Sequence, residues 1–175
     1  NGDTIWEVTV APPSGRSELD RLVDIDSAVK VVGTDIYAVT FQGKVARVDL
    51  ETGQVQWSRD MSSYSGMALD DDGLYVTSSQ GSVVKIGRRT GIEMWKVDSL
   101  LNRRLSPPGV VGSLVAAADL KGIVHFLDAA TGTLAARVNT SGDRVTAAPV
   151  VSGDTIIFLD TKGTLTALRV TAAAK

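Results

Sequence analysis

The sequence predicts an all-β chain of β-propeller blades, each a sheet of four antiparallel strands, with about four blades in its 175 residues. Three observations predict this fold: a repeat of about forty residues, short apolar runs separated by glycine turns, and no sustained helical periodicity. Four strands in a repeat of about forty residues are typical of a propeller blade rather than of a helical solenoid. One blade cannot cover both of its own faces, so we expect the blades to stack side by side.

The repeat is visible in three markers that keep their order along the chain. The segment Asp49–Trp57 (DLETGQVQW) recurs as Gly87–Trp95 (GRRTGIEMW) and, without the Trp, as Asp128–Ala136 (DAATGTLAA). A second marker is a glycine followed two residues later by an aliphatic residue, at Gly43, Gly81, Gly122 and Gly163. The third marker is an apolar pair, at Ile36-Tyr37, Leu74-Tyr75, Leu114-Val115 and Ile156-Ile157.

Taken in order, the elements begin with a lone outer strand at 1–10, because Gly2 precedes Trp6 by the same four positions that separate Gly53 from Trp57. Residues 11–27 form an insertion where the other repeats have a short turn. The blades follow at about 28–60, 61–99, 100–140 and 141–170, and the last one stops after its third strand. We hypothesise that the Trp6 strand completes this last blade, either in the same chain or in a strand-exchanged homodimer.

Within the second blade, the strands are expected near 66–70, 73–78, 82–87 and 92–97. Asp49 and Asp128 are expected to accept hydrogen bonds from the backbone N–H groups that follow them. The glycines of the hairpins, Gly53, Gly91 and Gly132, suit the positive φ that a tight turn requires. Trp57 and Trp95 are expected to fill the gap between adjacent blades.

Composition excludes several classes of function. There is no Cys, which rules out disulfides, thiolate zinc sites and thiol nucleophiles. The net charge of −2 does not favour nucleic acid or an anionic membrane surface. No apolar run is long enough for a membrane-spanning helix. The first residue is Asn1 and no signal-peptide pattern follows it, so we expect a processed chain or part of a longer one.

The repeat pattern G-x-[VL]-x-x-[LV]-D-x-x-T-G-x-x-x-W resembles that of PQQ-like propellers, and two further stretches narrow the resemblance. They are the insertion Ser17–Asp26 (SELDRLVDID) and Asp98–Pro107 (DSLLNRRLSP) after Trp95. With them the whole chain resembles the C-terminal half of the BamB family, lipoproteins of the outer-membrane β-barrel assembly machinery.

This resemblance implies an eight-bladed propeller on the periplasmic face of the outer membrane, held there by a lipid anchor that this chain lacks. It also implies binding to the periplasmic domains of BamA, the barrel-inserting subunit, and to unfolded outer-membrane proteins. Two acidic family residues that matter for the BamA contact match Asp24 and Asp26.

The residues themselves are compatible with such a partner site, although without the resemblance they favour a solvated turn. Asp24 and Asp26 are two apart, so their carboxylates share one side of an extended segment. Together with Asp20, Arg21 and Leu22 they would form an apolar contact ringed by charge, as in transient interfaces. The alternatives are a solvated turn whose acids bind nearby backbone N–H groups, or a calcium loop, for which the glycine and later Glu of an EF-hand are missing.

Three other groups have simpler explanations than a functional site. Asp70–Gly73 (DDDG) is expected to be a polar hairpin turn rather than a metal site. The arginine pairs 88–89 and 103–104 lack the interleaved aromatics of a nucleic-acid platform, so they are expected in solvated loops. His125, the single His, is expected to be a strand residue with a satisfied hydrogen bond.

The favoured function is therefore a non-enzymatic scaffold, with no catalytic residue, no cofactor, no metal and no nucleic acid. One alternative is a quinoprotein (PQQ-dependent) dehydrogenase, which would need a quinone pocket with calcium-binding acids. Another is an extracellular sensor or carbohydrate-binding propeller, whose stacking aromatics would come from only three Trp, three Tyr and three Phe.

Overall fold

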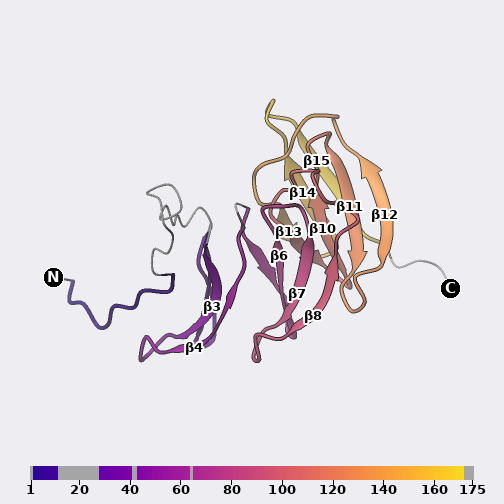
Figure 1. Ribbon diagram of the computed structural model, residues 1–175. Coiled ribbons are helices and arrows are strands. Elements are labelled where there is room, and N and C mark those ends of the chain that lie inside the picture. The colour runs from indigo at the N-terminus through magenta and orange to yellow at the C-terminus, as the bar shows by residue number, and fades with distance from the viewer. Residues whose placement is uncertain (1, 12–27, 41–42, 64, 172–175) are drawn as a thin grey trace, which may run out of the picture.

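The protein is all-β, as the sequence predicts. A computed structural model describes residues 2–11, 28–40, 43–63 and 65–171, and contains no helix within them. The described part of the chain accordingly offers no helix with the length and apolar character of a membrane span. Figure 1 shows the sheets side by side, from β3 and β4 near the N-terminus to β13–β15 near the C-terminus.

The strands form four separate antiparallel sheets, each built from consecutive strands. The first sheet contains β1 (Lys30–Val32), β2 (Asp35–Val39), β3 (Lys44–Asp49) and β4 (Val55–Asp60). The second contains β5 (Met67–Leu69), β6 (Gly73–Thr77), β7 (Val83–Gly87) and β8 (Glu93–Val97). The third contains β9 (Gly109–Val111), β10 (Leu114–Ala118), β11 (Ile123–Asp128) and β12 (Leu134–Asn139). The fourth has three strands, β13 (Val150–Ser152), β14 (Thr155–Leu159) and β15 (Leu165–Arg169).

The hydrophobic core lies between the sheets, in three clusters. One joins the first and second sheets, with Tyr37 and Val45 facing Leu74 and Ile86. The next two join the second sheet to the third and the third to the fourth. The central sheets are covered by a neighbouring sheet on both faces. Since side chains alternate between the two faces of a strand, every residue of β6 is buried. This is the packing expected of stacked blades.

The first and second sheets each contact the next sheet through a tryptophan on the fourth strand. Trp57 lies against Gly91 and donates from Nε1 to the carbonyl oxygen of Arg88, 3.1 Å away. Trp95 repeats this arrangement with Gly132 and the carbonyl oxygen of Ala129, at 3.2 Å. The predicted packing role of both tryptophans is confirmed. We call this arrangement of indole ring, hairpin glycine and carbonyl oxygen the tryptophan clasp.

The β3–β4 and β11–β12 hairpins have the predicted turn chemistry. Asp49 Oδ1 accepts hydrogen bonds from the backbone N–H groups of residues 51 and 52, at 3.0 and 2.8 Å. Asp128 Oδ1 accepts from residues 130 and 131 in the same way. The glycine that follows has φ of 71° at Gly53 and 75° at Gly132, a conformation that other residues adopt only with strain. The turn therefore places this glycine where the tryptophan of the preceding repeat can pack against it.

The single-chain form of the hypothesis, in which the Trp6 strand completes the last blade, is wrong. Trp6 makes a clasp with the first sheet, donating from Nε1 to the carbonyl oxygen of Leu50 at 2.9 Å and lying against Gly53. Figure 1 shows this N-terminal segment beyond β4, on the side away from β13–β15. It does not complete the last sheet of its own chain. No residue of 2–11 is in a strand, because a strand requires a hydrogen-bonded neighbour there.

Candidate functional site: the connection end of the sheets

The meander gives each sheet two distinct ends. At one end lie the tight hairpins that join β3 to β4 and β7 to β8, at the bottom of Figure 1. At the other lie the turns between the second and third strands and the connections from each fourth strand to the next sheet, at 61–66, 98–108 and 140–149. We call these the hairpin end and the connection end.

The five residues predicted to bind a partner, which are Asp20, Arg21, Leu22, Asp24 and Asp26, lie outside the described residues. The structure does place the point from which their segment departs. A Cβ added to Gly43 would lie 3.0 Å from the Cβ of Ala11, so Ala11 lies beside the β2–β3 turn at the connection end. Residues 11–27 also hold the same place in the repeat as the three connections. The described chain thus leads into the segment that bears the predicted partner site from a position beside the β2–β3 turn.

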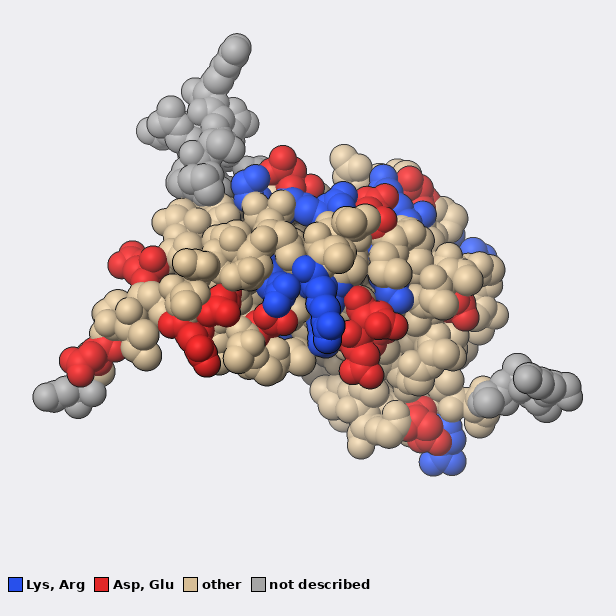
Figure 2. All heavy atoms as spheres, turned by 90° about the horizontal axis from the view of Figure 1, so that it is seen from below, with Lys and Arg blue, Asp and Glu red and all other residues tan. Residues whose placement is uncertain are grey.

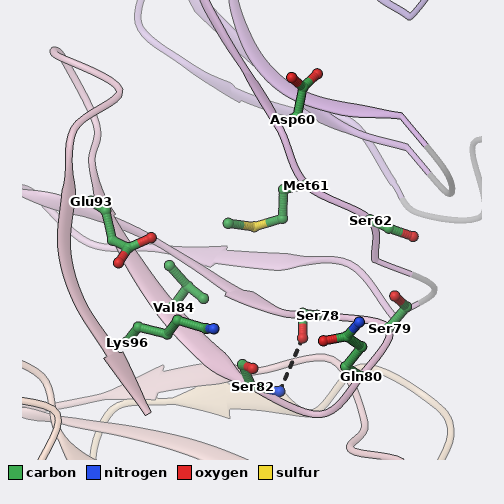
Figure 3. A pocket seen from close by; sticks show the side chains of 10 residues that line it. All are labelled: Asp60, Met61, Ser62, Ser78, Ser79, Gln80, Ser82, Val84, Glu93 and Lys96. Atoms are coloured by element: carbon green, nitrogen blue, oxygen red, sulfur yellow. Dashed lines mark hydrogen bonds between the residues drawn. The ribbon is translucent and has the colours of Figure 1, made fainter. Parts of the chain in front are cut away.

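A polar hollow of about 310 Å³ separates the first and second sheets at this end. Figure 3 shows Met61 extending into it, with Glu93 and Lys96 on one side and the turn 78–82 on the other. Its charges are already paired: Lys96 Nζ lies 3.1 Å from Asp98, and Asp60 lies 2.6 Å from Lys44. This hollow has no unpaired acid–base couple for catalysis, and no group of three metal-ligating side chains occurs among the described residues.

A second hollow, of about 470 Å³, lies on the other side of the same turn. Ser65, Ser78, Ser79, Arg104, Leu105 and Arg144 line it. Arg104 has φ of 51°, a left-handed conformation that is costly for a residue with a Cβ. Both arginine side chains are exposed, and neither forms an ion pair or side-chain hydrogen bond with the described part of the chain. Within the described part of the chain, the connection end therefore presents two guanidinium groups that form no ion pair.

A buried ionic network supports the connection beside this hollow. Asp119 and His125 are both almost fully buried, with His125 Nε2 donating to Asp119 Oδ2 at 3.0 Å. Arg103 donates to the same oxygen at 2.9 Å, and Asp119 Oδ1 accepts from the backbone N–H groups of residues 121 and 123. The hydrogen bond expected for His125 is confirmed at Nε2, whereas Nδ1 is buried without a partner among the described residues.

These contacts set the ionisation of Asp119. Burial alone raises the pKa of its carboxyl group, because it disfavours the charged form. The hydrogen bonds from His125, from two backbone N–H groups and from Arg103 outweigh burial and hold the pKa below its ordinary value. Asp119 is thus a carboxylate that ties the 98–108 connection to the third sheet. Sequence analysis missed it, because its partners come from three separate segments with no shared motif.

The hairpin end carries mixed charge. Figure 2, seen from below, shows Lys and Arg side chains near the middle of this face with Asp and Glu side chains around them. The pair 88–89 follows β7 at this end, whereas Arg103 and Arg104 lie beside the turn that precedes β7, so the two pairs form no common basic surface. Asp70 Oδ1 accepts from the backbone N–H of Gly73 at 2.6 Å, which confirms the predicted polar turn.

Comparison with known proteins gives the same family along the whole chain. A family model described as "Outer membrane protein assembly factor BamB" matches residues 1–97 and 79–175. The protein of that name from Pseudomonas aeruginosa is 38% identical over 166 residues, covering 95% of this chain and 44% of its own length. The crystal structure of BamB from Moraxella catarrhalis superposes with a TM-score of 0.87 at 30% identity, covering 95% of this chain and 49% of that one.

A quinohemoprotein alcohol dehydrogenase from Pseudomonas putida is a more distant structural neighbour. Its TM-score is 0.56 at 22% identity, with 65% of this chain and 20% of that chain covered. At this identity the likeness concerns the fold alone.

The chain spans about half the length of the BamB proteins that it matches. The match itself extends from the first described sheet to the last and includes the segment that bears Trp6. The chain belongs to the family of the outer membrane protein assembly factor BamB.

Proposed function

We propose that this chain works in outer-membrane protein assembly as a non-enzymatic scaffold in the periplasm. It binds the periplasmic domains of BamA and holds incoming outer-membrane proteins beside them. The observation that carries this proposal is the family match over residues 1–175, since the relatives are named for this assembly role. In the full-length protein, a lipid anchor would keep the scaffold at the membrane.

The structure supports a rigid scaffold. The sheets are joined by continuous buried clusters and by clasps at Trp57 and Trp95, so a segment attached to their ends is held on a stiff base. A partner surface on such a base loses less conformational entropy on binding than a free loop would. Acidic Asp24 and Asp26 in the predicted segment, and Arg104 and Arg144 in the hollow, would present charges of both signs, and these charges would set the orientation of the partner.

The proposal is tested by co-purification with the periplasmic domains of BamA. The double variant Asp24→Arg/Asp26→Arg is expected to lose at least tenfold in affinity, because it places two positive charges where the partner meets two negative ones. Its matched control is Glu51→Arg/Asp71→Arg, which makes the same change of charge at exposed positions of the hairpin end. Both variants are expected to melt at the temperature of the unmodified chain.

Two outcomes would overturn parts of the proposal. If the unmodified chain fails to bind BamA, the partner is wrong. If the Asp24/Asp26 variant binds as well as the control variant, the site is wrong. A separate titration with pyrroloquinoline quinone and calcium, followed by absorbance, tests the enzyme alternative, and stoichiometric uptake of the quinone would favour it.

A further inference from the structure

The connection end repeats one backbone hydrogen bond in three consecutive repeats. In each, a carbonyl oxygen of the connection accepts from an N–H group in the turn between the second and third strands of the next sheet. The pairs are Ser62 with Ser79 at 2.8 Å, Arg103 with Leu120 at 3.0 Å and Arg144 with Thr161 at 2.9 Å. Arg103 and Arg144 therefore occupy equivalent positions in successive repeats.

The side chains of these two equivalent arginines are used differently. Arg103 donates to Asp119 at 2.9 Å, as described above. The residue equivalent to Asp119 in the next repeat is Asp160, whose Oδ2 accepts from the hydroxyl of Ser141 instead. The side chain of Arg144 forms no hydrogen bond or ion pair with the described part of the chain, and it lines the second hollow. The described fold thus makes no structural use of this guanidinium group.

The other arginine of the hollow, Arg104, is held in place by its backbone. The carbonyl oxygen of Leu105 accepts from Ser65 Oγ at 3.0 Å, and that of Ser106 accepts from Thr77 Oγ1 at 3.0 Å. Next to these fixed groups, Arg104 has its left-handed φ of 51°. Such a conformation is costly for a residue with a Cβ, and residues of this kind cluster at ligand-binding positions. The wall of the hollow is therefore preorganised.

The acidic side chains near the two arginines already have partners. Asp119 is bonded to Arg103 and His125, and Asp143 lies 2.9 Å from Lys162 Nζ. Asp160 accepts from Ser141 and from two backbone N–H groups. Within the described residues, no carboxylate neutralises the guanidinium groups of the hollow.

The hollow lies in the interior of the chain. All the residues that line it fall between 65 and 144, in the second sheet and in the connections around it. The first sheet precedes this region and the fourth follows it. Three serine hydroxyl groups, of Ser65, Ser78 and Ser79, line it together with the arginines, so donors of two kinds are available.

We propose that this hollow binds the side-chain carboxylates of an acidic peptide segment of another protein. A guanidinium group matches a carboxylate with two parallel hydrogen bonds. The volume of about 470 Å³ lies in the range of about 300–1,000 Å³ typical of ligand sites, which gives room for several side chains rather than one small ion. This inference goes beyond the proposed function, because it concerns a class of ligand and holds whether or not BamA carries the segment.

Two other kinds of anion fit the hollow less well. A single-stranded nucleic acid would need aromatic side chains on which its bases stack, and none of the lining residues is aromatic. A small free anion would gain little, because Arg104 and Arg144 are both exposed and water screens their charge. A peptide that fills the hollow excludes this water and contacts both arginines at once.

Isothermal titration calorimetry of the unmodified chain with a hexaglutamate peptide tests the proposal. Hexaglutamate is expected to bind, more weakly as the salt concentration rises, whereas the uncharged hexaglutamine peptide is expected not to bind. Inorganic phosphate, at the same ionic strength as chloride, is expected to displace the peptide no better than chloride does. No binding of hexaglutamate would overturn the proposal. Specific displacement by phosphate would identify a site for small anions and would overturn the peptide as its occupant.

The two arginines are tested together by Arg104→Gln/Arg144→Gln. This variant is expected to bind hexaglutamate about tenfold more weakly, because it removes two charge pairs. Its matched control is Arg89→Gln/Arg137→Gln, which removes two exposed arginines outside the hollow that form no ion pair with the described part of the chain. The control is expected to bind nearly as the unmodified chain does. Equal losses in the two variants would show general charge attraction and would overturn the site.

A second pair of variants tests the hollow without changing any charge. Ser79 and Gln80 are exposed neighbours in the same turn, but only Ser79 lines this hollow, whereas both line the first one. Ser79→Tyr is expected to weaken hexaglutamate binding severalfold by filling the hollow, and Gln80→Tyr is expected to leave it unchanged. Thermal melting checks that all variants are folded, and the arginine pair decides the question if Ser79→Tyr is not. A folded Ser79→Tyr variant that binds as well as Gln80→Tyr would contradict the proposal.

Discussion

The indole ring of Trp57 lies across Gly91 of the next sheet, and a Cβ on that glycine would come within 2.8 Å of the ring. The same hairpin offers the carbonyl oxygen that accepts the indole N–H. This contact requires a glycine for two reasons: the ring occupies the space that a Cβ would fill, and the backbone has a positive φ of 70°. The clasp explains why the sequence repeats Thr-Gly and Trp at a fixed spacing.

The first prediction separates these two roles of the glycine. Gly91→Ala is expected to lower the free energy of unfolding by about 2–4 kcal/mol, since it combines left-handed strain with a collision against Trp57. The matched control is Gly153→Ala, at a φ of 58° with no atom within 4 Å of the new Cβ. The control is expected to cost only about 1–2 kcal/mol. Urea denaturation of both variants measures the difference, and equal losses would show that the ring contact contributes nothing.

The residues of the clasp were predictable because each repeat carries them within a short stretch of sequence. Asp49, Gly53 and Trp57 lie within nine residues, and each has a turn or packing role that its type makes clear. The side on which Trp6 packs was not predictable, because the repeat predicts a fourth strand around Trp6 but not which sheet lies beside it. The network around Asp119 was missed for another reason: Arg103 and His125 reach it from separate elements, and only the fold brings them together.

The second prediction concerns the carbonyl oxygens that receive the indole N–H groups. The carbonyl oxygen of Ala129 also accepts from Lys85 Nζ at 3.0 Å and from the Tyr75 hydroxyl at 3.3 Å. Among the described residues, the carbonyl oxygen of Arg88 accepts only from the Tyr37 hydroxyl at 3.4 Å besides the indole of Trp57.

Replacing each tryptophan by Phe removes the same N–H and the same volume. Trp57→Phe is therefore expected to cost about 0.5–1.5 kcal/mol more than Trp95→Phe, because it leaves its carbonyl oxygen nearly unpaired. Thermal or urea unfolding of the two variants measures this difference. A larger loss for Trp95→Phe would show that these other donors do not compensate for the indole.

The third prediction is an acid sensitivity that depends on Asp119. Its folded pKa lies below the ordinary value of about 3.9, so the folded state binds its proton less readily than the unfolded chain does. The stabilisation is therefore complete above about pH 4 and is lost as the pH falls through the lower folded pKa. Asp160, whose pKa the Ser141 hydroxyl and backbone N–H groups lower to about 2, contributes in the same direction.

Asp119→Asn removes the charge and one of these two contributions. At pH 7 it is expected to lower the free energy of unfolding by about 1–3 kcal/mol, because an amide cannot accept all the hydrogen bonds that the carboxylate accepts. The gap between the variant and the unmodified chain is expected to shrink between pH 4 and pH 2. Unfolding curves across this range measure it, with Asp154→Asn as an exposed control. A gap that stays constant with pH would show that the charge of Asp119 is not the cause.

The fourth prediction concerns the strained Arg104 at the connection end. Glycine accepts the φ of 51° without steric cost, so Arg104→Gly is expected to raise the free energy of unfolding by about 0.5 kcal/mol despite its added chain entropy. Arg144→Gly, at a neighbouring position of the same hollow that is not left-handed, is expected to lower it by a similar amount. If the free guanidinium groups contact the partner, both variants weaken co-purification with BamA although their stabilities change in opposite directions. Binding that follows stability instead would show that Arg104 is strained for a structural reason and does not touch the partner.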